Sequence, residues 1–363
     1  MKIINICLSV LTAVVTTNSY AQQDTVTRDV RNGDWVYTLQ DPEDHNKQFT
    51  WRYTPRNLID PKIKSEAQWN GSNFVYNYKV SNGSKAKHAL AFVWIRAPIV
   101  IQPESGAMLK PIQTAGMSDS EHIELIFQYA AAKKQQEKKI LKTPEKWYGR
   151  WNIENDGFIE FGWFPTVADD TYQGVPVGKT VKGFAITRPE LPGVMFAETS
   201  GATDSRMILG GLPEIGPIAD AVKTMVEEDT VWTPVMVPAI GIPTPYNGAE
   251  LARRIKTHVA TWLKFGLITQ DTLDRLNRGF DSLIAAQTYN NIAGTHTAVK
   301  EILQEAYNHH RGLNHTKHEE DDDEHDAEPV KRKAPAAAPL NRVAARALGF
   351  DLTYLLTRAY MSK

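Results

Sequence analysis

The stretch Asn73–Arg96 constrains the fold more than any other part of this chain. It reads NFVYNYKVSNGSKAKHALAFVWIR, and in each half the side chains alternate between two sets. A period of two is typical of β-strands, because successive side chains point to opposite faces of a sheet. Asn82-Gly83-Ser84 separates the halves and is a turn sequence. We therefore predict a β-hairpin on which further strands pack.

Residues 1–21 have the features of a secretory signal peptide. Lys2 precedes an apolar run over residues 3–15, and Ser19-Tyr20-Ala21 is a small-residue cleavage site. The alternative, a membrane anchor, would need a longer apolar run. The only cysteine, Cys7, lies in this segment, so the processed chain would have neither disulfides nor thiolates. We expect a secreted or periplasmic protein with no membrane span after cleavage.

Residues 30–200 have the pattern of a β domain, with about seven to nine short strands and no strand–helix–strand alternation. We predict an antiparallel β-sandwich, immunoglobulin-like or similar, with a closed barrel as the alternative. Residues 54–72 are expected to form a loop. The other predicted strands are Asp34–Gln40, Gln48–Tyr53, a hairpin over Trp147–Trp163 turning at Asp156-Gly157, Val181–Thr187 and, as the last, Val194–Thr199.

Residues 106–146 interrupt this pattern. Ser118 and Glu121 have the spacing of a helix capping box. Apolar side chains then recur at helical spacing, which predicts a helix packed over the sandwich, with a functional lid as the alternative. These side chains are Ile123, Ile126, Phe127 and Ala130.

Residues 201–247 read as a Pro/Gly-rich connector. Prolines, which cannot donate to a central ladder, recur every few residues in Val231–Pro245 and predict extended or polyproline-like chain that lies against the sandwich or the helices. Residues 248–360 then change to helical spacing and predict an antiparallel helical bundle. An acidic, His-rich loop at 314–339 precedes the last helix. The predicted class is a β+α multidomain protein.

Several of these features together resemble secreted bacterial proteins of uncharacterised function. They are the signal peptide, aromatic strands such as Phe74–Tyr78, a turn such as Pro192-Gly193 and the C-terminal helical segment. The resemblance covers most of the chain. It implies a sandwich followed by helices, but no activity and no functional residues.

Histidines and acids cluster near the C-terminus and suggest a metal site. Eight acidic residues lie within Glu319–Glu328. Imidazole with carboxylate suits Zn²⁺, Cu²⁺ or Ni²⁺, and carboxylates alone suit Ca²⁺. The alternatives are a solvated, disordered segment or one whose acids pair with Lys331–Lys333. The candidate ligands are His309, His310, His315, His318 and His325.

Tryptophans in the β region suggest a glycan site, because exposed indole rings stack on sugars. The alternative is that they fill the core. We single out Trp163 with the loop residues Asp169, Asp170 and Tyr172, since acids beside aromatics suit sugar hydroxyls. The tryptophans concerned are Trp35, Trp51, Trp94, Trp147, Trp151 and Trp163.

No catalytic motif is evident. Glu154, Asp156 and Glu160 surround one predicted turn and are the only hydrolase candidates, while GxSxG and HExxH are absent. His258 is expected to be a packing residue. Net charge is −1, which gives no nucleic-acid signature. We expect a non-enzymatic binding or structural protein of the bacterial envelope whose partner is a glycan or a protein. The alternatives are a metal-binding protein and, third, a secreted hydrolase.

The metal hypothesis makes a prediction of its own. A ligand that binds only the folded state raises the melting temperature. Zn²⁺, Cu²⁺, Ni²⁺ or Ca²⁺ should therefore stabilise the chain lacking residues 1–21 in a thermal-shift assay. The gain should disappear in a variant that also lacks residues 314–334. An equal gain in both proteins would place the metal elsewhere.

Overall fold

The computed structural model describes residues 25–361 apart from short gaps and the segments 101–117, 202–218, 225–229 and 312–338. Its strands are β1 (Thr25–Arg28), β2 (Trp35–Gln40), β3 (Gln48–Tyr53), β4 (Pro61–Trp69), β5 (Phe74–Asn82), β6 (Leu90–Pro98), β7 (Leu141–Lys142), β8 (Trp147–Ile153), β9 (Phe158–Pro165), β10 (Val167–Ala168), β11 (Thr171–Tyr172), β12 (Lys179–Arg188), β13 (Leu191–Gly201) and β14 (Val231–Ile240). Its helices include α1 (Asp119–Ile140), α3 (Gly248–Thr261), α4 (Gln270–Thr288), α5 (Ile292–Arg311) and α6 (Arg342–Met361).

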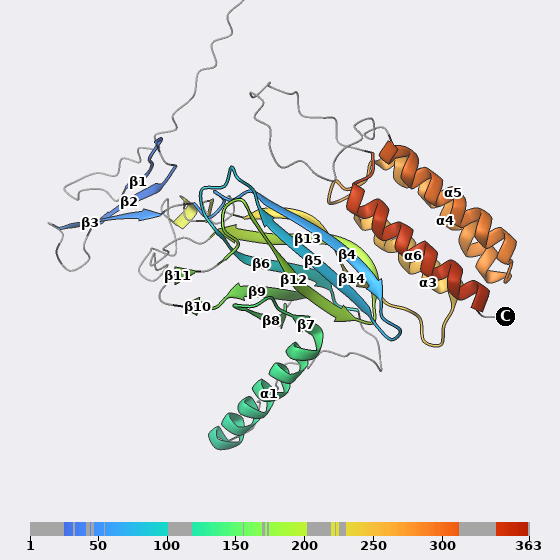
Figure 1. Cartoon of the computed structure of the whole chain (residues 1–363), viewed down its shortest axis with the longest axis horizontal. Helices are drawn as coiled ribbons and strands as arrows, with labels where there is room; N and C mark the ends of the chain where they lie inside the picture. Colours follow the sequence, from blue (N-terminus) through green and yellow to red (C-terminus); the bar gives the residue numbers. More distant parts are fainter. Residues whose placement is uncertain are drawn as a thin grey trace, which may run out of the picture.

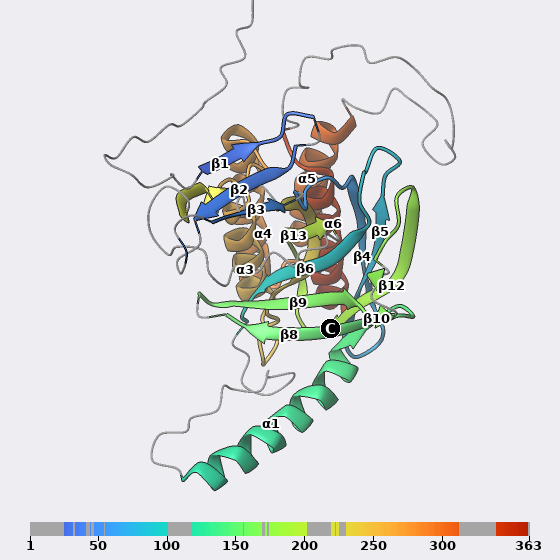
Figure 2. The ribbon, with the colours of Figure 1, turned by 90° about the vertical axis from the view of Figure 1, so that its left-hand side faces the viewer.

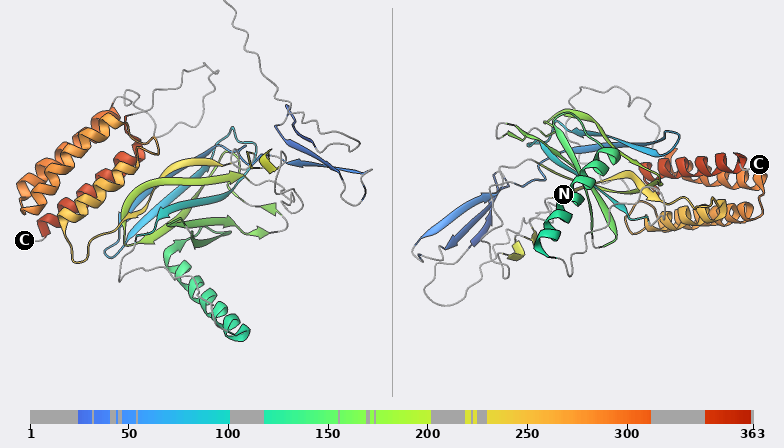
Figure 3. Two further views of the ribbon diagram at one scale, coloured as in Figure 1. Left: turned by 180° about the vertical axis from the view of Figure 1, so that it is seen from behind. Right: turned by 90° about the horizontal axis from the view of Figure 1, so that it is seen from below.

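The strands form antiparallel sheets, and helices α3–α6 follow them in the chain, so the predicted β+α class is confirmed. The two larger sheets have the strand orders β4-β5-β12-β7 and β14-β13-β6-β9-β8. The helices lie at one end of these sheets, and the small sheet β1-β2-β3 lies apart at the other end (Figures 1 and 3).

Side chains from the two larger sheets share one core. The Trp163 ring of β9 lies 5.9 Å from the Tyr78 ring of β5 and 5.7 Å from the Phe184 ring of β12, measured between centroids. The Tyr78 hydroxyl donates to the main-chain carbonyl of Met236 in β14, at 2.8 Å. The buried hydrophobic cluster continues without a break into helices α3–α6.

The predicted hairpin over Asn73–Arg96 is wrong, although both of its strands exist. β5 and β6 belong to different sheets, so the chain crosses from one sheet to the other between them. A tight two-residue hairpin at Asn82-Gly83 would require positive φ there, and neither residue has it. Instead the buried Asn82 side chain donates to the carbonyls of His88 and Val175 and holds the crossing. The hairpin partner of β5 is β4, across a turn with Gly71 at φ 101°.

Residues 54–72 were predicted to be a loop, but they contain β4. Ile63 and Ser65 are buried in it while their neighbours Lys62, Lys64 and Glu66 are exposed, which is the expected period of two. The strand pattern was missed because a polar residue, Ser65, occupies a core-facing position where an apolar residue is expected. The Ser65 hydroxyl is satisfied there, because it accepts a 2.9 Å hydrogen bond from the Met236 main chain.

The predicted connector also contains a strand, because β14 pairs with β13 along nearly its whole length. Both main-chain groups of Met236 bond to side chains of the other sheet, so they point away from β13. Pro234 and Pro238 lie two residues to either side and share this orientation. Their missing N–H groups are therefore on the outer edge, where no ladder bond is lost.

The hairpin predicted at Asp156-Gly157 is confirmed by the pairing of β8 with β9.

Helix α1 has the predicted capping box between Ser118 and Glu121. The expectation that its apolar side chains pack on the sheets is wrong. Ile123 and Phe127 are 56% and 70% exposed. Only the C-terminal part of the helix approaches the sheets, and the rest projects away from them (Figure 2).

Helices α3–α6 surround a shared core, with contacts between each pair of consecutive helices and between α6 and α3. The start of α6 is fixed by main-chain hydrogen bonds to the α3–α4 connection. The Asn341 N–H donates to the Leu267 carbonyl at 2.7 Å, and the Thr269 N–H donates to the Pro339 carbonyl at 2.9 Å. Helix α6 returns in this way between α3 and α5, and it also contacts β4, β13 and β14.

His258 joins α3 to β13. Its Nε2 accepts a 3.1 Å hydrogen bond from the Val194 main-chain N–H, so Nδ1 carries the proton. The approach is so close that a Cβ on Gly193 would lie 2.2 Å from Nε2. Burial lowers the pKa of His258 to about 4. His258 is thus a satisfied packing residue, as the sequence predicted.

Replacing this imidazole should destabilise the chain near neutral pH. His258→Leu leaves the buried Val194 N–H without an acceptor, which costs about 1–3 kcal/mol. His296→Leu removes an exposed imidazole and serves as the matched control. Chemical unfolding at pH 7.5 should separate the two variants by that amount, and equal stabilities would contradict the role.

The same group predicts an acid-dependent loss of stability. The unfolded histidine takes up a proton near pH 6.5 whereas the folded one does so near pH 4. The His258 contribution is therefore present above pH 6.5 and falls by about 3 kcal/mol as the pH drops to 4. His258→Leu should lack this component in unfolding curves measured across that range.

Candidate binding groove

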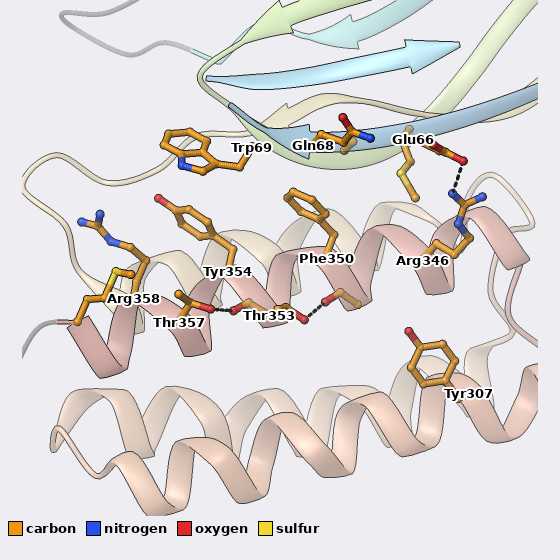
Figure 4. Close-up of a pocket in the computed structure, with 14 residues that line it drawn as sticks. Glu66, Gln68, Trp69, Tyr307, Arg346, Phe350, Thr353, Tyr354, Thr357 and Arg358 are labelled. Atoms are coloured by element: carbon orange, nitrogen blue, oxygen red, sulfur yellow. Dashed lines mark hydrogen bonds and ion pairs between the residues drawn. The ribbon is translucent and has the colours of Figure 1, made fainter. Parts of the chain in front are cut away.

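A groove of about 680 Å³ lies between strand β4 and helix α6 (Figure 4). A cavity of this volume is in the range that binds small ligands or short polymers. Its lining is rich in aromatic and guanidinium groups. The side chains that define it here are Glu66 and Trp69 of β4 and Arg346, Phe350, Tyr354 and Arg358 of α6.

Helical spacing brings four of these side chains onto one face of α6. Arg346, Phe350, Tyr354 and Arg358 follow one another at intervals of four residues, which aligns them along a helix. The Asn341 side chain accepts from the Val343 N–H at 2.8 Å and helps to satisfy the first turn. The groove face of α6 therefore carries two aromatic rings between two cations.

The aromatic rings of the groove rest on Phe74, which is fully buried in β5. Its centroid lies 4.7 Å from the Trp69 ring, 5.8 Å from Phe350 and 5.5 Å from Tyr354, the last two in edge-to-face contact. Such pairs contribute about 0.5–1.5 kcal/mol beyond their burial. Trp69 is nevertheless 47% exposed, so its ring remains accessible to a ligand.

Each end of the α6 face carries a positive charge. Arg346 donates to the Ser65 carbonyl at 3.2 Å and lies 4.0 Å from the Glu66 carboxylate. Arg358 lies over the Tyr246 ring, 4.7 Å from its centroid. Burial raises the pKa of Tyr246 to about 12 and raises that of Tyr354 as well, so both phenols are neutral at physiological pH. The groove therefore presents two guanidinium groups, the Glu66 carboxylate and the neutral Tyr354 hydroxyl, whereas Tyr246 is not part of its lining.

Trp163, which the sequence suggested for a glycan site, lies in the core. This side chain is fully buried, and its indole N–H donates to the Lys142 carbonyl at 3.0 Å, so the ring fills the core. Asp169 and Asp170 lie outside the described residues. Of Tyr172 the structure describes only the main chain, in β11. Trp147 and Trp151 are also buried.

The proposed metal ligands fall mostly outside the described part of the chain. His309 and His310 belong to the last turn of α5, without described side chains. His315, His318 and His325 lie within 312–338. In the residues that the structure does describe, no three His, Cys, Asp or Glu side chains come together as a metal site.

The acids of the β8–β9 hairpin surround an arginine. Arg96 lies 2.5 Å from the Asp156 carboxylate and 3.3 Å from that of Glu160. Partial burial, and then the charge of Glu154, raises the pKa of Glu160. An ion-pair role accounts for this arrangement.

Comparisons with protein-family models, curated protein sequences and solved structures found no match to this chain. Every helix in the described ranges falls short of the length and apolarity that crossing a membrane requires.

Sequence reasoning missed the groove because its two walls are distant in the chain. Trp69 lay in a segment interpreted as a loop. The four-residue spacing from Arg346 to Arg358 was the available signal, since arginines continue the stripe that holds Phe350 and Tyr354.

Asp351 adjoins this face of α6 and is buried, and one of its carboxylate oxygens has no hydrogen-bond partner among the residues that the structure describes. Burial raises the pKa of Asp351 well above its ordinary value, so the carboxyl group favours its neutral form. The charge of an ionised Asp351 would also disfavour ionisation of Tyr76. Asp351 is not among the residues that line the groove, and the burial of its carboxyl group is a cost to the fold.

Removing this carboxyl group should stabilise the protein at neutral and alkaline pH. Because the folded pKa is raised, the favourable contribution of Asp351 is fully present below about pH 3.9 and is lost as the pH rises. Asp351→Asn and Asp351→Leu should therefore raise the melting temperature by a few degrees more at pH 8 than at pH 4. An equal change in melting temperature at both pH values, or a lower melting temperature at pH 8 alone, would contradict a raised pKa for the buried Asp351.

Proposed function

We propose that this chain is a non-enzymatic binding protein of the bacterial envelope or its surroundings, and that the β4–α6 groove is its ligand site. The observation that carries the proposal is the half-exposed Trp69 ring beside Tyr354 in an open cavity. Exposed aromatic rings in a concave site are costly to leave in water, and they provide binding energy when a ligand covers them.

The architecture proposed for this role is a β-sandwich followed by an antiparallel four-helix bundle. The shared core of the two larger sheets supports the first part. The contacts that connect α3, α4, α5 and α6 in a ring support the second. Location in the periplasm or outside the cell rests on the signal-peptide features of residues 1–21.

The groove suits a ligand that combines apolar surface with polar or anionic groups. The rings of Trp69 and Tyr354 can cover a sugar face or an apolar side chain. Arg346 and Arg358 can donate to hydroxyl, carbonyl or carboxylate oxygens. Both a glycan and a polypeptide segment meet these requirements.

The proposal predicts that ligand binding depends on the Trp69 ring. The chain lacking residues 1–21 should be tested against chitin, cellulose, xylan and peptidoglycan oligosaccharides and against a random heptapeptide library. Binding raises the melting temperature, and Trp69→Ala should lower the affinity of any true ligand by about tenfold or more.

Trp232→Ala is the matched control for this test. Trp232 is 48% exposed, almost as much as Trp69, but it does not line the groove. Its replacement should leave ligand affinity unchanged. If Trp69→Ala preserves the affinity of every ligand found, or if Trp232→Ala weakens it equally, the groove is not the binding site.

A further inference from the structure

We infer that the occupant of the groove is an extended polypeptide segment that adds as a strand to the outer edge of β4, with acidic residues at its ends. This inference rests on the proposed function and specifies its ligand. Three features of the groove support it: the direction of the β4 main-chain groups, the parallel course of the aromatic face of α6, and the charges at the two ends.

The main chain of β4 presents hydrogen-bonding groups to the groove. In an antiparallel pair, hydrogen-bonded residues alternate with residues whose N–H and C=O point away from the partner strand. Main-chain bonds join Asn70 to Asn73 and Asp60 to Gly83 at the two ends of the β4–β5 pair. Given the register of this hairpin, both bonds show that the even-numbered residues of β4 are the ones whose main-chain groups hydrogen-bond to β5.

The odd-numbered residues of β4 therefore direct their main chain outward, away from β5. The 3.2 Å bond from Arg346 to the Ser65 carbonyl agrees with this direction. β14 covers the edge at Ser65, where the Met236 N–H reaches the Ser65 hydroxyl. Ala67 and Trp69 lie beyond that point and line the groove. No described residue hydrogen-bonds to their outward N–H and C=O groups.

A strand added at this edge would run beside the aromatic face of α6. From Arg346 to Met361 the helix rises about 22 Å, at 1.5 Å per residue. An extended peptide advances about 3.3 Å per residue, so about seven residues span the groove. Alternate side chains of such a strand would point toward Phe350 and Tyr354, which favours apolar residues two positions apart.

The positive charges at the two ends of the groove favour acidic residues at the two ends of the bound segment. Arg346 and Arg358 lie on either side of the two rings, three α-helical turns apart along α6. The one acidic group of the lining, Glu66, lies near Arg346 and is 63% exposed. Acidic residues or a terminal carboxylate at the ends of the strand complement the guanidinium groups, and this attraction weakens with salt.

A polypeptide fits these features better than a glycan does. A glycan that stacks on the rings would account for the aromatic side chains, but it gives no role to the outward main-chain groups of Ala67 and Trp69. Those groups have the spacing at which one β-strand hydrogen-bonds to another. Strand addition uses both, because the edge supplies main-chain hydrogen bonds and the rings supply side-chain contacts.

The test uses a phage-displayed random heptapeptide library on the chain lacking residues 1–21. Selected peptides should carry apolar residues at alternate positions and an acidic residue near an end. Ala67→Pro removes one outward N–H without breaking a bond to β5 and should weaken binding about tenfold, whereas Ala67→Ser should not. Melting curves establish that both variants remain folded.

Peptide chemistry tests the same point without altering the protein. N-methylation of alternate peptide residues should abolish binding when it removes the N–H groups that face β4. Methylation of the intervening residues should be tolerated. Equal tolerance at all positions, together with unchanged binding to Ala67→Pro, would overturn strand addition.

Two outcomes would replace the occupant while retaining the groove. If oligosaccharides bind in a Trp69-dependent manner and no peptide is selected, the inference of a polypeptide occupant is overturned, while the proposed binding function is retained. Sedimentation showing a dimer that Trp69→Ala dissociates, with no peptide selected, would identify a second copy of this chain as the occupant. If no probe binds and the chain is monomeric, the groove itself fails as a site.

Discussion

The packing of Phe74 against helix α6 is the contact on which the rest of this structure depends. Phe74 belongs to β5, yet its ring touches Trp69 of β4 and both Phe350 and Tyr354 of α6. One fully buried side chain thus fixes the β4–β5 hairpin, the last helix and the groove between them. The aromatic residues of the groove are held by the core rather than by a loop, which gives a ligand a preformed surface.

A few buried polar groups determine how the two larger sheets meet. Ser65 and Tyr78 satisfy the outer main-chain groups of Met236, so β14 ends its sheet without exposing those groups to the core. Prolines on either side of Met236 prevent further pairing along that edge. The edge of β4 is consequently covered near Ser65 and open near Trp69, which places the groove at the end of the strand.

The sequence predicted the local structure of many elements and the partners of few. Alternation in Phe74–Asn82 identified a strand, but turn residues at Asn82-Gly83 suggested the wrong neighbour, because side-chain hydrogen bonds hold that crossing open. Ser65 concealed β4, since a buried serine is recognised only by its partner in another sheet. Trp163 was proposed for a ligand and is in the core, whereas Trp69 was assigned to a loop and lines the groove. Periodicity reports which face of an element is buried, not what covers it.

The position of α6 explains why the groove could not be derived from either half of the chain alone. Leu340 forms an isolated bridge with Ile268, and the bonds beside it fix where the helix starts. From that point α6 must bury Leu348, Leu352 and Leu355 among the helices, which turns Phe350 and Tyr354 toward β4. A helix with one face in the helical core and the other on a sheet edge leaves a gap wherever the edge strand carries no neighbour. The groove is therefore a consequence of joining the two parts, and its aromatic lining reflects the same packing that holds them together.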